Sequence, residues 1–152
     1  MPSLESLTSS ELIFPDLQAT DGPAVLRELA EAVAARGAVR DAETLFQRLW
    51  EREQLGSTAI GHGVAIPHCK LTGLPRVLVA IGVSRRGVDF GATDGQPVRL
   101  FFLVASPSQS PAEHLQSLAA ISKWVKGDRN VERVLGLADA QAIAAVIRGE
   151  ER

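Results

Sequence analysis

The sequence has a single cysteine, Cys69, among its 152 residues. One cysteine cannot form an internal disulfide, and such sparse use is typical of a reducing compartment. There is also no Cys-x-x-Cys pair, and the spacing of His62, His68 and Cys69 does not match that of structural zinc ligands. We therefore expect neither a disulfide framework nor a metal site.

Long apolar runs and an excess of basic charge are also missing. No run of apolar residues approaches the length that crosses a membrane. The N-terminal stretch 1–5 has neither the basic start nor the apolar core of a signal peptide. The formal net charge is −2 and the sequence pI is about 5.9, so nothing favours nucleic-acid binding. We expect a cytoplasmic protein without membrane insertion.

Signals for a nucleotide site and for a second domain are missing too. No glycine-rich loop ends in Gly-Lys-Ser or Gly-Lys-Thr, the ending that holds nucleotide phosphates. No internal repeat, low-complexity tract or interdomain linker interrupts the chain. With 45% apolar residues, a chain of this length can bury one core. We expect no cofactor and a single domain over residues 1–152, in which the polar, serine-rich residues 1–10 form a loose lead-in.

What the chain does contain is an alternation of helical and strand patterns. Residues that cap helices, some followed by a first-turn proline, precede several stretches with apolar residues at helical spacing. We expect helices that begin near Asp21, Asp41, Ser110, Asp128 and Asp139, strands over 11–14, 64–66, 77–83 and 98–104, and turns at Gly87 and 91–95. This order predicts an α/β fold with one sheet covered by helices on both faces.

The helix that begins near Ser110 carries a second histidine. Its start, Ser110-Pro111-Ala112-Glu113, has the residues of a capping box and a proline in the first turn. His114 follows in the first turn, where the helix dipole disfavours a positively charged imidazole. We expect the core-facing stripe of this helix to consist of Leu115, Leu118, Ala119, Ser122 and Val125, with Trp124 on the flank.

Polar chemistry is densest in residues 52–70, a glycine-rich stretch just before a run of strands. Pro67 fixes its own φ and pushes Ile66 towards extended geometry, so His68 is presented by a stiff backbone just past the strand 64–66. A neutral imidazole has one free nitrogen, while a hydrogen bond to a backbone carbonyl can lock the other. His68 is therefore a candidate nucleophile, and the alternative is a structural histidine.

Other side chains in this stretch suit an anion. Ser57, Thr58 and neighbouring backbone N–H groups are candidates to cradle it, and Arg52 is a candidate to neutralise charge on a transferring phosphoryl group. Arg52 also falls in the last turn of a predicted helix, where a cation favours the helix end without any further role.

The order of these residues resembles a known signature. Arg52-Glu53, Gly56-Ser57-Thr58 and the run 61–68, Gly-His-Gly-Val-Ala-Ile-Pro-His, resemble the phosphorylation site of EIIA proteins of the fructose/mannitol class. These proteins belong to the bacterial phosphoenolpyruvate-dependent phosphotransferase system. Within the class, the stretch is most similar to the nitrogen-regulatory EIIA. The resemblance extends through residues 94–98 and the helix of His114, and so covers most of the chain.

The resemblance implies a fold and a site. The sheet should be mixed, with helices on both faces. His68 should accept a phosphoryl group from an HPr-type phosphocarrier protein, and His114 should lie beside it as a supporting residue. His62 falls at a variable loop position. Cys69 stands where many relatives carry a small residue, and the phosphocysteine of EIIB partners gives no reason to assign that role to it.

Two functions of different kinds fit this chemistry. In one, the protein is a regulator whose phosphorylation state switches its binding to target proteins. In the other, it is a sugar-transport component that passes phosphate to an EIIB domain. A third alternative is a binding module that has lost phosphotransfer, although the intact signature argues against it. The chain carries no fused EIIB domain, which favours the regulator, a phosphotransferase component with a phosphohistidine intermediate.

Overall fold

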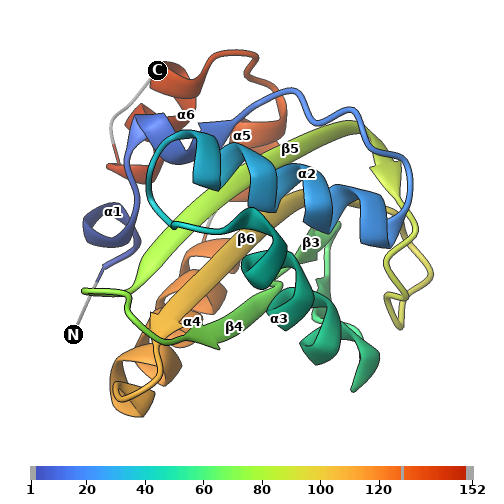
Figure 1. Cartoon of the computed structure of the whole chain (residues 1–152). Helices are drawn as coiled ribbons and strands as arrows, with labels where there is room; N and C mark the ends of the chain where they lie inside the picture. The colour runs from blue at the N-terminus through green and yellow to red at the C-terminus, as the bar shows by residue number, and fades with distance from the viewer. Residues whose placement is uncertain (1–2, 128, 150–152) are drawn as a thin grey trace.

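The computed structural model of the chain describes residues 3–127 and 129–149. It is a central sheet between two helical layers (Figure 1). Its elements are α1 (Leu4–Leu7), a 3-10 turn η1 (Ser10–Leu12), β1 (Ile13–Phe14), α2 (Gly22–Ala35), α3 (Ala42–Gln54), β2 (Ala59–Gly61), β3 (Val64–Ala65), β4 (His68–Leu71), β5 (Leu78–Val88), β6 (Val98–Pro107), α4 (Pro111–Val125), α5 (Asn130–Leu135) and α6 (Ala140–Ile147).

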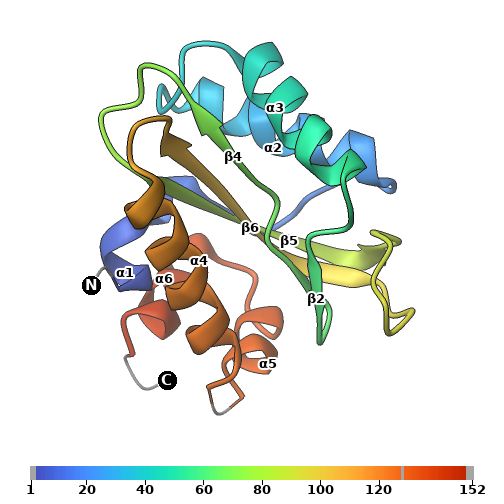
Figure 2. The ribbon, with the colours of Figure 1, turned by 90° about the horizontal axis from the view of Figure 1, so that it is seen from below.

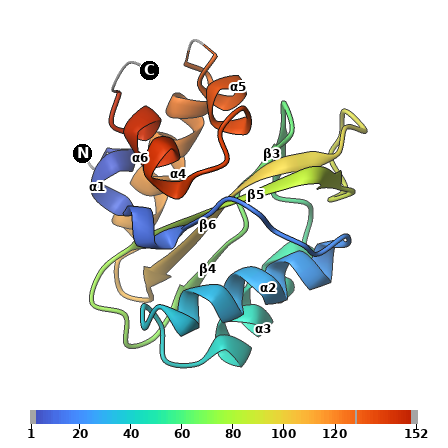
Figure 3. The ribbon, with the colours of Figure 1, turned by 90° about the horizontal axis from the view of Figure 1, so that it is seen from above.

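Two separate cores hold the layers together. Helices α2 and α3 cover one face of the sheet, while α1, α4, α5 and α6 cover the other, as Figures 2 and 3 show from below and from above. The α2 and α3 starts were predicted correctly. The Asp21 carboxylate accepts the N–H of Ala24 at 2.8 Å, and the Asp41 carboxylate accepts that of Glu43 at 3.0 Å.

The sheet is mixed, which confirms the expected fold class. Its strand order is β1-β5-β6-β3-β2, and β4 also pairs with β6. Strand β5 is antiparallel to β6, whereas β3 and β4 run parallel to β6, one after the other. Pro67 lies between β3 and β4, and its carbonyl accepts the N–H of Val104 at 2.9 Å. His68 therefore follows β3, as predicted, and it also begins the further strand β4, opposite Val104, which was not predicted.

The N-terminal residues and α4 differ from expectation. Leu4 in α1 is buried between α4 and α6, so the described part of residues 1–10 is packed and not loose. Leu115 and Ala119, both expected in the core, are exposed, Leu115 by 66%. Of the predicted stripe, Leu118 and Ser122 are partly buried and only Val125 is fully buried. The buried side chains of α4 are His114, Ser117, Ile121 and Val125. The Ser110 side chain makes no capping hydrogen bond, so the helix starts where predicted but without the capping box.

Gly87 is an irregularity inside β5 and not a turn between strands. The pairing of β5 with β6 shifts register between Val83 and Val88, and Gly87 has φ +84. A Cβ at this position would lie 2.8 Å from the Cβ of Pro97. The glycine thus allows both the backbone conformation and the close approach of the next strand. Within the described ranges, no helix has the length and apolarity needed to cross a membrane.

Candidate functional site

His68 lies at the start of β4 with one ring nitrogen already engaged. Its Nδ1 is 2.8 Å from the carbonyl oxygen of Ile66, two residues earlier. A carbonyl oxygen can only accept, so Nδ1 must carry the proton and Nε2 keeps its lone pair. The extended backbone around Pro67 produces this contact, as the sequence suggested. The result is a half-buried imidazole with a single free, nucleophilic nitrogen.

His114 packs against His68 from the other side of the sheet edge. The two ring centroids are 5.3 Å apart and the ring planes are tilted by 58°. His114 lies in the first turn of α4, is only 6% exposed, and its Nδ1 is 2.7 Å from the hydroxyl of Ser106 in β6. The structure therefore brings together the two histidines that the sequence singled out.

Both imidazoles are held in the neutral form. Burial lowers the pKa of His68, against the opposing effect of the Ile66 carbonyl, and the positive charges of Arg52 and Lys70 lower it further. Burial also lowers the pKa of His114 to about 4, with smaller contributions from His68 and Lys70. A neutral His68 ring keeps its Nε2 lone pair available for bond formation at neutral pH.

A hollow of about 400 Å³ opens over these rings. Its lining has three cationic side chains and one carboxylate; the residues are Arg48, Glu51, Arg52, Leu55, His68, Cys69, Lys70 and His114. The carboxylate, on Glu51, lies 3.3 Å from Arg48, so two of the cations face the hollow without an acidic partner in its lining. This charge pattern suits an anion such as a phosphoryl group.

Arg52 is held beside the hollow at the end of α3. Its Nη1 donates to the carbonyl oxygen of Gly56 at 2.8 Å, which ties the last helical turn to the loop that follows. The guanidinium keeps further N–H donors for a ligand, since one of its five is used here. The structure thus supports both interpretations of Arg52, as a helix-end cation and as a residue of the site.

Ser57 and Thr58 do not line the hollow. The Ser57 hydroxyl donates to the carbonyl oxygen of Phe90 at 2.6 Å and accepts the N–H of Ala59 at 3.0 Å. The Thr58 N–H and hydroxyl donate to the two carboxylate oxygens of Glu53 at 2.7 and 2.9 Å. Both hydroxyl protons are therefore used within the protein, and these contacts fix the loop between α3 and β2.

Cys69 lines the same hollow as His68 and His114, whereas His62 lies apart from them. The Cys69 side chain is 7% exposed, and burial raises its pKa to about 12, so the thiol stays protonated. His62 is exposed at the turn between β2 and β3, with φ +60, and lines a separate hollow beside α5. Over residues 3–127 and 129–149, no group of three or more His, Cys, Asp and Glu side chains is placed to hold a metal ion.

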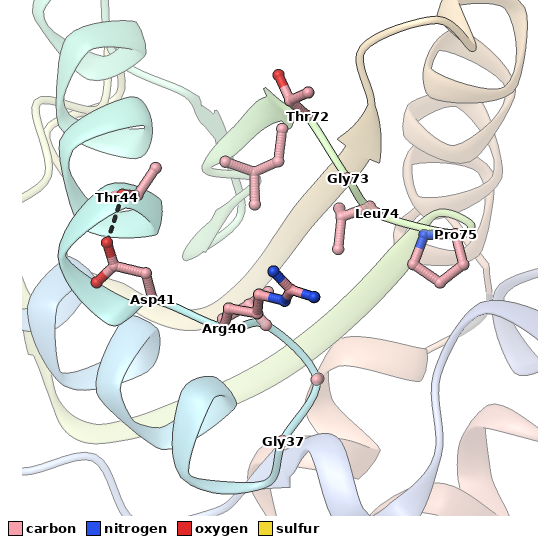
Figure 4. A pocket seen from close by; sticks show the side chains of 11 residues that line it. Gly37, Arg40, Asp41, Thr44, Thr72, Gly73, Leu74 and Pro75 are labelled. Carbon is pink, nitrogen blue, oxygen red and sulfur yellow. Dashed lines mark hydrogen bonds between the residues drawn. The ribbon is translucent and has the colours of Figure 1, made fainter.

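Figure 4 shows another hollow, of about 490 Å³, between the α2–α3 connection and the segment after β4. Its polar side chains include Arg40, Asp41, Thr44 and Thr72, and the Thr44 hydroxyl donates to Asp41 at 2.6 Å. No histidine or cysteine lines it. The candidate nucleophile and the cations gather instead at the start of β4.

Sequence reasoning missed Lys70 and Ser106. Alternation along β4 places Lys70 on the same side as His68, and the strand spacing was the signal for it. Ser106 is a polar residue, 0% exposed, that follows the apolar run from Leu100 to Ala105 in β6. The polar residue at this position was visible in the sequence, but its hydrogen bond with His114 was not.

Comparisons with known proteins give the family and the fold that the chain resembles. Residues 6–149 match the family described as phosphoenolpyruvate-dependent sugar phosphotransferase system, EIIA 2. The nitrogen regulatory protein of Bradyrhizobium diazoefficiens is 38% identical over 144 residues, which cover 95% of this chain and 94% of that protein. The fructose-specific EIIA component of Haloferax volcanii is 28% identical with the same coverage of both chains. The crystal structure of nitrogen regulatory protein IIA-Ntr from Neisseria meningitidis superposes with a TM-score of 0.86 at 27% identity, covering 95% of this chain and 98% of that one.

Proposed function

The chain belongs to the EIIA 2 family of the phosphoenolpyruvate-dependent sugar phosphotransferase system, and from this premise we propose that it is a nitrogen-regulatory phosphohistidine protein. It accepts a phosphoryl group on His68 from an HPr-type phosphocarrier. Its phosphorylation state is then the signal that target proteins distinguish. The phosphoryl transfer takes place in the cytoplasm. Cysteines without a disulfide partner, such as Cys69, are usual in that compartment.

The observation that carries the proposal is the bond from His68 Nδ1 to the Ile66 carbonyl, which leaves Nε2 bare beside a cationic hollow. In the transfer, the Nε2 lone pair forms a bond to phosphorus. The P–N bond of the carrier's phosphohistidine breaks, and its electron pair returns to the carrier's ring. The proton on Nδ1 stays in place, and the Ile66 carbonyl stabilises the positive charge that the ring acquires. Because both partners are imidazoles, the transfer is close to thermoneutral, so the site needs mainly positioning and charge stabilisation.

The supporting residues divide this work. Arg52, already oriented by the Gly56 carbonyl, faces the negative charge that the phosphoryl group brings. His114 packs on His68 and offers a ring nitrogen to a phosphoryl oxygen. Ser57 and Thr58, expected to bind phosphate, contribute by fixing the loop that follows Arg52, because their hydroxyl protons are already donated.

Partners dock over the hollow, since the carrier's phosphohistidine must reach His68 there. Two exposed leucines belong to the elements that supply the site. Leu55 lines the hollow at the end of α3 and is 83% exposed, and Leu115 follows His114 on α4. A protein interface usually combines an apolar centre with a polar rim, and these leucines would supply part of the apolar contact. A regulatory target that uses the same face competes with the carrier.

A sugar-transport EIIA component is the second candidate function. Its support is the fructose-specific relative, which aligns over the same share of this chain. The nitrogen regulatory relative has higher identity at equal coverage, 38% against 28%, which favours regulation.

Labelling tests the proposal. The protein is incubated with phosphoenolpyruvate, enzyme I and an HPr-type carrier, and the label is mapped by mass spectrometry under alkaline conditions. We expect an acid-labile, alkali-stable label on His68 in the wild type and in His62→Ala, and none in His68→Ala or His68→Gln. Normal labelling of the His68 variants would overturn the proposal.

A further inference from the structure

Strand β6 turns one face towards α4 and α5, and the side chains on that face are apolar from Leu100 to Val104. Leu100, Phe102 and Val104 are 0% exposed and belong to the core beneath these helices. Ser106 follows two residues later, so its side chain points to the same face, and it is also 0% exposed. Burying a hydroxyl group costs free energy unless it is hydrogen-bonded. The partner of this hydroxyl is therefore informative.

The Ser106 hydroxyl lies 2.7 Å from Nδ1 of His114, and within the described ranges its oxygen makes no other side-chain hydrogen bond. If Nδ1 carried a proton and donated it to Ser106, the buried hydroxyl hydrogen would have no acceptor. If the hydroxyl donates to a bare Nδ1, both groups are satisfied. The second arrangement leaves the single proton of a neutral His114 ring on Nε2.

We propose that Ser106 is a positioning residue for the phosphoryl transfer, which holds His114 in its Nε2–H form so that this N–H donates to a phosphoryl oxygen on His68. This inference rests on the proposed function. It makes the two histidines complementary. The Ile66 carbonyl keeps the proton of His68 on Nδ1 and leaves Nε2 bare, while the Ser106 hydroxyl does the reverse at His114.

Because His114 is neutral, the ring nitrogen that carries its single proton determines whether it can donate to a phosphoryl oxygen. With a pKa of about 4, the ring carries one proton at neutral pH and can donate from one nitrogen only. To reach a phosphoryl group on His68, the donating nitrogen has to be Nε2, because Nδ1 is engaged with Ser106. His114 lines the hollow together with His68. A cationic ring would donate from both nitrogens and would need no help from Ser106. A neutral ring in the wrong form would instead turn a lone pair towards the phosphoryl oxygens.

The first test measures the proton positions in the unphosphorylated protein. Ring-nitrogen NMR of ¹⁵N-labelled wild type at neutral pH should show Nδ1 bare and Nε2 protonated in His114, with the reverse in His68. In Ser106→Ala the Nδ1 signal of His114 should lose the shift caused by its hydrogen-bond donor. A protonated Nδ1 in wild-type His114 would overturn the proposal. No phosphoryl donor is needed, so this result stands apart from the proposed function.

The second test separates positioning from a simple structural tie between α4 and β6. Ser117 is a matched control on α4, the helix of His114. Like Ser106 it is 0% exposed, and its hydroxyl donates to the Glu113 carbonyl at 2.8 Å. We expect Ser106→Ala to slow the transfer step about tenfold, the rate equivalent of one hydrogen bond, with an unchanged KM for the carrier. Ser117→Ala should stay near the wild-type rate, and Ser106→Thr should recover most of it.

A rate within twofold of wild type in Ser106→Ala, or an equal loss in Ser117→Ala, would overturn the proposal. Failure of the proposed function looks different, because the wild type itself would then carry no label on His68. In that case the NMR result alone decides whether Ser106 sets the proton position of His114.

Discussion

The carbonyl oxygen of Ile66 lies 2.8 Å from Nδ1 of His68, and this single contact leaves Nε2 as the ring nitrogen with an available lone pair. The carbonyl is fixed because Pro67, which follows it, is buried and its own carbonyl is bonded to β6. The strand backbone thus acts on the chemistry directly, without another side chain.

The phosphoryl group should consequently sit on Nε2 of His68. A phosphoryl group on Nδ1 would displace the carbonyl contact, whereas Nε2 is free. Phosphorus and ring-nitrogen NMR of the phosphoprotein at alkaline pH distinguishes the two isomers. A phosphoryl group bonded to Nδ1 would contradict the assignment.

Arg52→Ala should slow phosphoryl transfer by about 10²-fold, the usual cost of losing one group that stabilises developing charge. The matched control is Arg48→Ala, because Arg48 lines the same hollow but lies 3.3 Å from the Glu51 carboxylate. We expect a much smaller loss there. Rapid-quench measurement of His68 labelling compares the two, with circular dichroism to check the fold. Equal rates in wild type and Arg52→Ala would remove Arg52 from the site.

Stability should fall in mildly acid solution because of His114. Its pKa is about 4 in the folded protein against an ordinary value of 6.5, so the unfolded chain binds a proton first as pH falls. The free energy of unfolding is therefore unaffected above about pH 6.5 and decreases as pH falls to about 4, by roughly 3 kcal/mol. His68 contributes in the same direction, since its pKa is also lowered.

Urea unfolding at several pH values measures this decrease. His114→Gln should flatten the curve between pH 6.5 and 4, even if the variant is less stable overall. His62→Gln removes a histidine from an exposed turn and serves as the control. A His114→Gln curve parallel to that of the wild type would show that another group causes the acid sensitivity.

Local signals predicted much of this fold. The caps Asp21, Asp41 and Asp139 act as expected because each carboxylate needs only an N–H two or three residues away. The outward rotation of Leu115 was missed, since helical spacing fits a leucine stripe as well as one that starts at His114. The contact of His114 with Ser106 in β6 selects between the two, and such a tertiary contact has no local signal.

In the candidate site, too, local features were predicted and tertiary contacts were not. The order of residues around His68 singled it out, and a hydrogen bond from one ring nitrogen to a backbone carbonyl was expected, although the sequence did not identify that carbonyl as the one of Ile66. Ser57 and Thr58 were expected to face an anion, but their partners are Phe90 and Glu53. A glycine-rich loop leaves the direction of a hydroxyl undetermined, because several backbone conformations are open to it.

Exposed leucines should control how the carrier binds and not how it reacts. Leu55→Ser and Leu115→Ser should each raise the KM for the phosphocarrier about five- to tenfold, the range expected for truncating an interface anchor. The transfer rate at saturation should stay near wild type. Ile60→Ser is the control, since Ile60 is 43% exposed on β2 and, unlike Leu55 and Leu115, neither lines the hollow nor adjoins a residue that does. An equal effect of all three variants would argue against a docking site centred on His68.

The last prediction concerns what the phosphoryl group is for. We expect it to act as a signal: phosphorylation of His68 should change the affinity for at least one target protein that has no role in sugar transport. The added negative charge falls in a hollow lined by Arg52, Lys70 and the exposed Leu55, and the exposed Leu115 follows the lining residue His114 on α4. It therefore changes the charge and the solvation of the surface on which partners dock. Coupling of about 1–3 kcal/mol, or roughly five- to 150-fold in affinity, is typical of such switches.

A pull-down from lysate tests this prediction by comparing three baits, namely unmodified protein, phosphoprotein and His68→Ala. Regulation requires a partner that separates the phosphoprotein from the other two, and Leu55→Ser should weaken its capture. If only phosphocarrier and EIIB proteins respond to the state of His68, and a sugar becomes phosphorylated through it, the transport function is correct and regulation is not.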